Sequence, residues 1–243
     1  MRRVIAAELQ KWRRTWFLLV TVAATLATPL MVLLMFLIND RTPEWQDVFE
    51  QGMMFSLLLF GPLTVTLIGA QLIATEYQHD TWKLMFTAPV ARWKVYLTKW
   101  LVGFVWIMSL SVLVIFGNLM VGLLVGATGP VKIWIWTNFF LLGGVGLSVM
   151  LPVYNLITLI SRNFFVTSAI GIITTFAAVF VINSKYAGLL PQSSVLILLR
   201  PLIGDQIRPD MIGSAPLWLG MNAAIAATAL VASTLFVQKA DYR

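Results

Sequence analysis

Six stretches of the chain, each at least 22 residues long, contain no Asp, Glu, Lys, Arg or His. The hydrocarbon core of a bilayer is about 30 Å thick, and about 20 helical residues span it at a rise of about 1.5 Å each. A membrane β-barrel would instead show short segments of alternating polarity, and these stretches do not alternate. The sequence therefore predicts an all-α integral membrane protein with transmembrane helices over residues 15–39, 51–75, 100–126, 133–160, 163–184 and 214–238.

Composition excludes several other classes of protein. Of the 243 residues, 59% are hydrophobic and 11% are charged, against about 25% charged in a soluble domain. The chain has no Cys, one histidine (His79) and no Gly directly before a Lys, so thiolate chemistry, Ser-His triads and the phosphate-binding GxxxxGK[ST] loop all lack their parts. We therefore expect no catalytic residue and no metal site. We assign the net charge of +7 to the membrane surface rather than to a nucleic-acid partner.

The distribution of Lys and Arg predicts the orientation of the helices. With the N-terminus inside, twelve of these residues fall in the inner segments and five in the outer ones. Basic residues are in excess on the cytoplasmic side of membrane proteins. Both termini are therefore predicted to be cytoplasmic.

The residues before the first predicted span have an amphipathic pattern. Ile5, Leu9, Trp12 and Trp16 are spaced as one face of a helix, and most of the basic residues lie off that face. Such a helix is suited to the cytoplasmic membrane interface, with its basic face toward anionic lipid. The alternative is that these basic residues serve only as the topological anchor of the first span.

The inner segment 76–99 is the part of the chain richest in charge. Asp80 or Thr81 can cap a short helix, which Pro89 must end because proline lacks an N–H group. This helix carries apolar side chains that no neighbouring sequence obviously covers: Trp82, Leu84 and Met85. Either a partner protein covers them, or the segment is a connector that packs on its own bundle.

On the outer side, residues 186–199 are uncharged but too few to span the membrane. Pro191 and Pro201 bracket a short helix over Ser193–Leu199. We predict a re-entrant or interfacial segment over 186–210.

Within the predicted spans the polar groups are uncharged. Asn118, Asn155 and Asn222 are typical of hydrogen bonds between helices. Two stripes of small and hydroxyl residues indicate close packing, either inside the subunit or across a dimer: Thr21, Thr25 and Thr28, and Thr167, Gly171, Thr174 and Ala178. Bends are expected at Gly61-Pro62, Gly143-Gly144 and Pro152.

These features resemble the permease subunits of ABC-2-type ABC transporters, and most strongly the small six-helix permeases that confer bacitracin or lantibiotic self-protection. The resemblance extends over the layout of the whole chain. Family members commonly have Gly where Asp80 stands and Ser where Ala91 stands. The residues that carry the resemblance are Ala7-Glu8 and Lys11 before the first span, and then Glu76, Asp80-Thr81, Pro89-Val90-Ala91-Arg92 and Lys99.

The resemblance implies that 1–243 is a single transmembrane permease domain. It would export an amphipathic or lipid-like substrate, such as a peptide antibiotic, across a bacterial plasma membrane. This chain would not be an enzyme, because ATP and Mg²⁺ would be bound by two separate ABC ATPase subunits. A second permease chain, identical or related, would pack against the first and fifth helices.

The resemblance also implies roles for particular residues. Trp82, Leu84 and Met85 would fill a groove on the ATPase, with Glu76, Lys83 and Arg92 at its rim. The residues assigned to ATPase coupling are Glu76, Asp80, Thr81, Trp82, Lys83, Leu84, Met85, Pro89 and Arg92. Those assigned to an elbow helix over 1–14 are Glu8, Lys11, Arg13 and Arg14, and those assigned to a dimer interface or pathway are Thr21, Thr25, Thr28, Thr167, Gly171 and Thr174.

Two other functions compete with a transport subunit. A membrane scaffold or sensor could recruit a cytoplasmic partner through 76–99 without transport. An ATP-independent carrier is the third hypothesis, and the absence of charged residues from the predicted spans counts against it.

Overall fold

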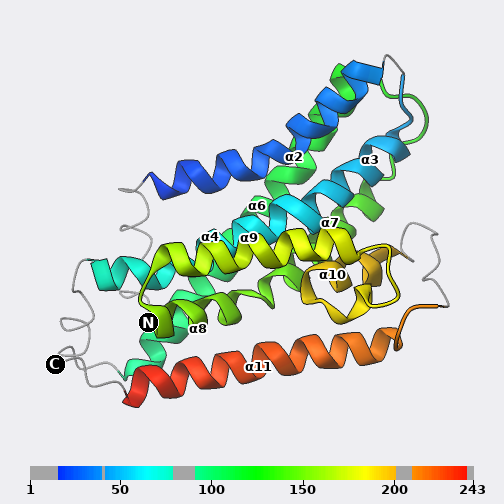
Figure 1. Cartoon of the computed structure of the whole chain (residues 1–243). Helices are drawn as coiled ribbons and strands as arrows, with labels where there is room; N and C mark the ends of the chain where they lie inside the picture. Colours follow the sequence, from blue (N-terminus) through cyan, green and yellow to red (C-terminus); the bar gives the residue numbers. More distant parts are fainter. Residues whose placement is uncertain (1–15, 40–41, 79–90, 201–209, 240–243) are drawn as a thin grey trace.

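The computed structural model describes residues 16–39, 42–78, 91–200 and 210–239. Within these ranges the chain is helical, and its only strand-like pairing is an isolated bridge between Glu44 and Thr128. The elements are α2 (Phe17–Asn39), α3 (Trp45–Met54), η1 (Phe55–Phe60), α4 (Gly61–Gln78), α6 (Arg92–Leu124), α7 (Ile133–Ser148), α8 (Leu151–Ser161), α9 (Phe164–Val181), η2 (Ala187–Leu189), α10 (Pro191–Leu199) and α11 (Ala215–Lys239) (Figure 1).

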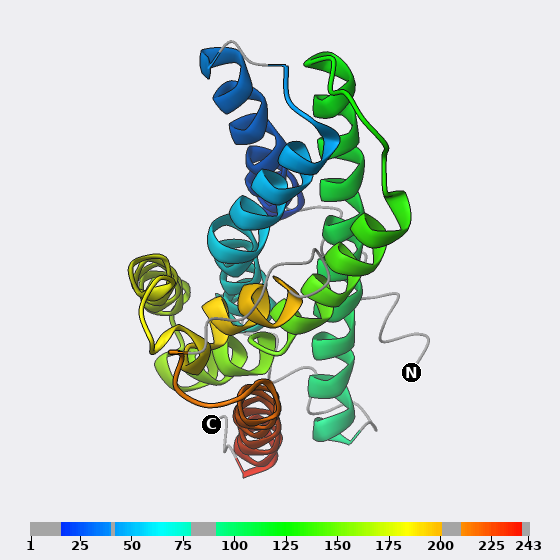
Figure 2. The same cartoon turned by 90° about the vertical axis from the view of Figure 1, so that its right-hand side faces the viewer.

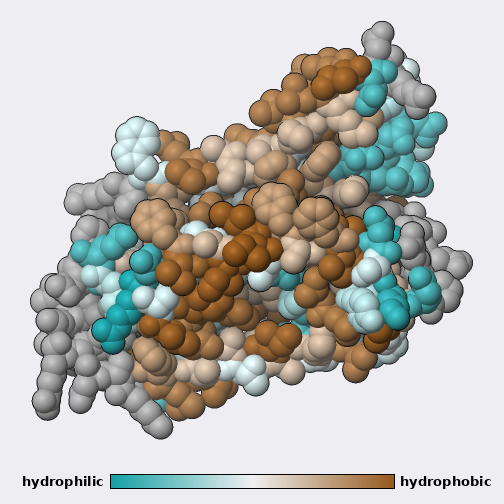
Figure 3. All heavy atoms as spheres, viewed as in Figure 1, coloured by the Kyte–Doolittle hydropathy of each residue, from teal (hydrophilic) through white to brown (hydrophobic). Residues whose placement is uncertain are grey.

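Six helical units in these ranges are long and apolar enough to cross a membrane, as the sequence predicts. Two of them join several elements, since α3, η1 and α4 form one unit over Trp45–Gln78 and α7 and α8 form another over Ile133–Ser161. The surface agrees with this interpretation. Figure 3 shows a broad apolar band across the middle of the molecule, with hydrophilic side chains gathered toward its two ends. The chain is therefore a multi-pass membrane protein.

The second unit is irregular where the sequence predicts a bend. Residues Phe55–Phe60 form a π-helix that ends at Gly61-Pro62. Pro62 has no N–H group to donate to the preceding turn. A Cβ on Gly61 would clash with the carbonyl oxygen of Ser56, so glycine is required for this close approach.

The fourth unit breaks between α7 and α8, directly before Leu151-Pro152. The bend expected at Pro152 is therefore present. The bend expected at Gly143-Gly144 is wrong, because both glycines lie inside α7. There a Cβ on Gly143 would come within 2.6 Å of Leu57, so these glycines allow close helix packing instead.

The core of the subunit surrounds α4. This helix packs against α8 and α9 and also contacts α2, and its buried face includes Val65, Ile68 and Leu72. Figure 2 shows α9 and α11 nearly end-on at the periphery of the bundle. Their outward side chains, such as Phe180 and Val231, are exposed in the subunit.

Candidate functional site

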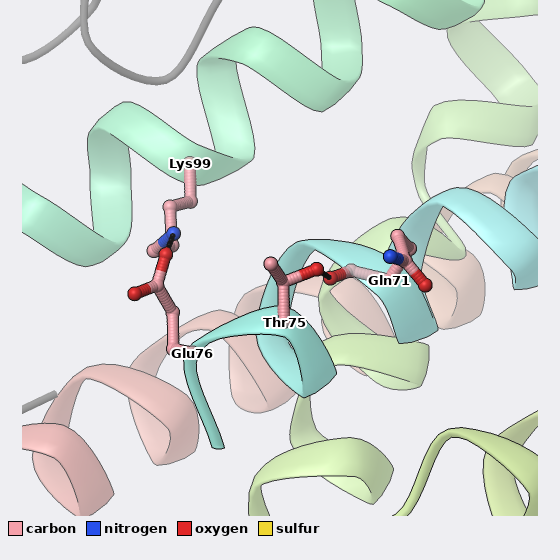
Figure 4. A network of polar contacts seen from close by, with 4 residues as sticks. All are labelled: Gln71, Thr75, Glu76 and Lys99. Carbon is pink, nitrogen blue, oxygen red and sulfur yellow. Dashed lines mark hydrogen bonds and ion pairs between the residues drawn. The ribbon is translucent and has the colours of Figure 1, made fainter. Parts of the chain in front are cut away.

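A buried ion pair joins the last turn of α4 to the beginning of α6. Lys99 Nζ lies 2.6 Å from Glu76 Oε1, and each side chain is only 1% exposed (Figure 4). Moving one unpaired charge out of water costs several kcal/mol, whereas two opposite charges in contact offset much of that cost. The two residues therefore depend on each other for their place in the bundle.

The neighbouring polar contact in Figure 4 is local to α4. The hydroxyl of Thr75 donates to the carbonyl oxygen of Gln71, 2.7 Å away and one turn earlier. This bond satisfies Thr75 within its own helix. It does not connect helices as the ion pair does.

Tyr77 joins the same end of α4 to α8. Its hydroxyl donates to the carbonyl oxygen of Leu159 at 3.3 Å, and the guanidinium of Arg162 lies 5.9 Å from the centre of its ring. Arg162 ends α8 in the left-handed backbone region, with φ of 53°, which is unfavourable for a residue with a side chain. The turn into α9 is therefore strained at a residue that contacts α4.

Arg92 joins the first turn of α6 to the last turn of α11. Its Nη1 donates to the carbonyl oxygen of Gln238 at 3.2 Å. The carboxyl-terminal end of a helix carries partial negative charge on carbonyl groups that lack a partner within the helix. A guanidinium is well suited to such carbonyls. We call Glu76, Tyr77, Arg92, Lys99 and Arg162 together the basal junction.

The basal junction corrects one prediction and leaves others open. Glu76 was predicted to lie at the exposed rim of an ATPase groove, but it is buried against Lys99, because α4 and α6 both extend beyond the charge-free stretches. Arg92 lies within the described residues and contacts α11. The other coupling residues lie outside the described residues, as do the four of the elbow helix: Asp80, Thr81, Trp82, Lys83, Leu84, Met85 and Pro89, and Glu8, Lys11, Arg13 and Arg14.

The threonine stripe of α2 faces the interior of the subunit. Thr21, Thr25 and Thr28 are buried, and Trp106 Nε1 of α6 donates to the hydroxyl of Thr21 at 3.1 Å. The hydroxyl of Thr25 donates to the carbonyl oxygen of Thr21 at 2.8 Å. Of the two alternatives for this stripe, packing within the subunit is the one observed.

The stripe of α9 is also internal. Thr167 is fully buried, with its hydroxyl 2.8 Å from that of Thr158, and Thr174 lies 3.4 Å from the hydroxyl of Tyr154. A Cβ on Gly171 would clash with Thr66 of α4. These residues form the seam between α9 and its neighbours α4 and α8, and their assignment to a dimer interface or pathway stays a prediction.

A second polar network surrounds α10. Gln192 Nε2 donates to the hydroxyl of Tyr154 at 3.3 Å, and Asn222 Nδ2 donates to Ser194 Oγ at 2.7 Å. Together with Thr174 these residues form what we call the α10 network. It joins α8, α9, α10 and α11 with uncharged groups, and Asn222 has the interhelical role that the sequence predicts.

Sequence reasoning missed two features of these sites. It noted Lys99 as part of a family pattern but did not pair it with Glu76, and it gave Tyr77 no role. A signal for the pair was present, since Glu76 directly follows one charge-free stretch and Lys99 directly precedes the next. No comparable signal pairs Gln192 with Tyr154.

One internal cavity among the described residues is too small for a typical ligand. A cavity of about 30 Å³ lies between α2, η1, α4, α6 and α7, lined by residues that include Thr28, Ser56 and Ser111. Sites for small molecules are typically about 300–1,000 Å³. No group of three or more His, Asp or Glu side chains in the described ranges is placed to hold a metal ion.

Comparison with known proteins decides the family. The sequence model for the "ABC-2 family transporter protein" matches residues 4–178, which is well over half of the chain. The chain belongs to the ABC-2 transporter family. The chain is also similar to the bacitracin transport permease protein BCRB of Bacillus licheniformis, with 24% identity over 173 residues, covering 70% of this chain and 83% of that protein.

The family match places the basal junction within an ABC-2 permease. Residues 4–178 include the helices that carry Glu76, Tyr77, Arg92, Lys99 and Arg162. The match ends before α10 and α11, which contribute Gln192, Ser194 and Asn222 to the α10 network. The charged network therefore lies wholly within the family's shared region, and the α10 network lies there only in part.

Proposed function

We propose that this ABC-2 permease is the membrane subunit of an exporter driven by a separate ATPase. The substrate would be amphipathic or lipid-like, and a peptide antibiotic of the bacitracin type is the specific candidate. The observation that carries the proposal is the family match over residues 4–178, which spans the charged segment 76–99. The likeness to a bacitracin transport permease supports the substrate class.

ATP hydrolysis on the inner side of the membrane would drive transport. Two ABC ATPase subunits would bind ATP and Mg²⁺ and contact the permease through the segment 76–99 and an elbow helix over 1–14. An ATPase pair can shift the permease only through contacts that differ between its two states. The basal junction supports this assignment, because it ties both ends of the segment 79–90 to the helical bundle.

A second permease chain, identical or related, would complete the transporter. The small stripes of α2 and α9 are occupied inside the subunit, so the partner would meet the opposite, exposed faces of these helices. On α2 this face includes Leu30 and Leu37, and on α9 it includes Ile173 and Phe180.

Orientation completes the proposal. Both termini and the segment 76–99 would face the cytoplasm of a bacterial cell, and the residues 186–210 would form a re-entrant segment outside. A single cysteine can test this, because the chain has none of its own. We expect Asp205→Cys to react with an impermeant maleimide in intact cells. Labelling only after lysis would invert the topology.

The decisive test of function is copurification from native membranes, with the partners identified by mass. We expect an ABC ATPase to accompany the permease, and bacitracin, used as the probe, to stimulate ATP hydrolysis by the complex. Trp82→Ala should dissociate or uncouple the ATPase, because losing a buried aromatic anchor costs about 2 kcal/mol or more. Lys83→Ala is the matched control, since a rim charge contributes little to affinity. Recovery of a non-ATPase partner alone would favour the scaffold hypothesis.

A further inference from the structure

The Glu76–Lys99 pair has a role beyond the stability of the bundle. We propose that it is a positioning pair that clamps the end of α4 to the beginning of α6, so that the two ends of the segment 79–90 move as one body. The functional part of this inference rests on the proposed coupling role of 76–99, whereas the clamp itself does not.

The position of the pair in the chain is the first argument. Glu76 lies two residues before the end of α4, and Lys99 lies seven residues after the start of α6. Their contact at 2.6 Å therefore closes the connection between two adjacent spans at its membrane ends. The two helix ends cannot separate or slide past each other without breaking this contact.

The surroundings of the pair are the second argument. Four helices contribute a fully buried apolar cluster next to it: Ile73 of α4, Tyr96 of α6, Leu159 of α8 and Val237 of α11. Ile73 and Tyr96 each lie one helical turn before a member of the pair. Separating the charges here would leave two buried ions without their main partner, which is far more costly than at an exposed surface. The two charges are therefore either in contact or fully separated, because a partly separated pair would have a high free energy.

The neighbouring contacts indicate which helices would move together with the clamped ends. Tyr77 ties the clamped end of α4 to α8, and Arg92 ties the clamped start of α6 to α11. A displacement of the segment 79–90 would therefore reach four helices together. Without the clamp, α4 and α6 could move separately, and a displacement of the segment 79–90 would not be passed on to the other helices.

Spin labels can measure the clamp without any partner protein. Gln78→Cys and Trp93→Cys place labels on exposed or half-exposed positions at the two ends, in a chain that has no other cysteine. The purified permease in lipid nanodiscs should give one narrow distance distribution. The neutral double variant Glu76→Gln/Lys99→Met should give a broader and longer distribution, and the charge-reversed variant Glu76→Lys/Lys99→Glu should recover the narrow one.

The neutral double variant decides the question, because it removes both charges of the pair together. A narrow distribution in this variant would overturn the proposal, since packing alone would then hold the ends. Failure to recover it in folded form would overturn the proposal as well, because the pair would then be a requirement for folding. Thr75→Val is the matched control, as Thr75 bonds only within α4, and should leave the distribution unchanged.

The assembled complex provides a second readout. If the clamp transmits motion, the neutral double variant should retain its ATPase, but the stimulation of ATP hydrolysis by bacitracin should fall about fivefold or more, the lower range of coupling between sites. Unchanged stimulation with a broadened distance distribution would refute the transmission role but leave the clamp intact. If the distance measurements agree with the clamp but the permease copurifies with no ATPase, the proposed function is refuted and the clamp is not.

Discussion

The basal junction and the α10 network hold helices together by different means. The first relies on a buried ion pair between α4 and α6, and the second relies on hydrogen bonds among Tyr154, Gln192, Ser194 and Asn222. Figure 1 shows α10 at the right of the view, whereas α11, whose last turn contacts Arg92 of the junction, ends at the left. The two networks thus lie toward opposite ends of the bundle.

The difference in chemistry implies a difference in behaviour. A charge that loses its partner in a membrane interior cannot be satisfied cheaply, so an ion pair acts as a switch between two states. An uncharged side chain that loses its partner finds water or another polar group at modest cost. We therefore expect a single mutation in the basal junction to cause a large loss of stability, and a single mutation in the α10 network to cause a small one.

Glu76→Gln should give the largest loss of stability, by about 3–5 kcal/mol, because it removes the carboxylate that lies 2.6 Å from the buried ammonium group of Lys99. The measurement is thermal unfolding in detergent, together with the amount of folded protein recovered from membranes. Glu76→Gln/Lys99→Met should be more stable than Glu76→Gln alone. If the double variant were less stable than the single one, the charge on Lys99 would not be the cause of the loss.

Gly171→Leu should have an intermediate effect, because Gly171 lies in the seam between α9 and α4 and a larger side chain would press on Thr66. Overpacking of a close seam costs about 1–3 kcal/mol. We expect a lower melting temperature for the isolated subunit, with the oligomeric state unchanged. Ile172→Leu, on the exposed face of the same helix, is the control and should change neither. Dissociation of a dimer without a loss of subunit stability would return Gly171 to an interface between chains.

How far the sequence predicts this structure depends on the kind of signal. The six spans follow from the absence of charge, which is a property of each segment by itself. The helices α4 and α6 extend past the charge-free stretches to include Glu76 and Lys99, because opposite charges can be buried once they meet. That meeting is a property of two segments together, and no single stretch encodes it.

The small-residue stripes show the same limit. Thr167 and Gly171 lie on the closely packed face of the helix, whereas Thr175 rather than Thr174 is the fully buried residue of the next turn. The spacing of such residues does not identify the partner, because α4 of the same subunit and a helix of a second chain require the same small side chains. Gly143-Gly144 was similarly ambiguous between a bend and a close contact, and only the position of Leu57 on another helix resolves it.

Asn222→Ala tests the α10 network and should have a small effect. It removes the hydrogen bond to Ser194, and such bonds between membrane helices contribute about 0.6 kcal/mol on average. Thermal unfolding should show a shift several times smaller than that of Glu76→Gln. Thr228→Val is the control, because Thr228 bonds only within α11. A loss of 3 kcal/mol or more, about the effect expected for the ion pair, would remove the contrast between the two networks.

Arg162→Gly should have the smallest net effect, because two changes of opposite sign occur at one residue. The substitution removes the guanidinium from the ring of Tyr77, a contact that contributes about 0.5–1 kcal/mol at an exposed site. It also relieves the left-handed backbone at φ of 53°, which costs a residue with a side chain about 1–2 kcal/mol and costs glycine little. Arg162→Ala keeps the backbone strain and loses the same contact, so it should be less stable than Arg162→Gly by about 1 kcal/mol. Thermal unfolding of the two variants side by side separates these contributions. Equal stabilities would show that the turn between α8 and α9 changes its backbone when Arg162 is replaced.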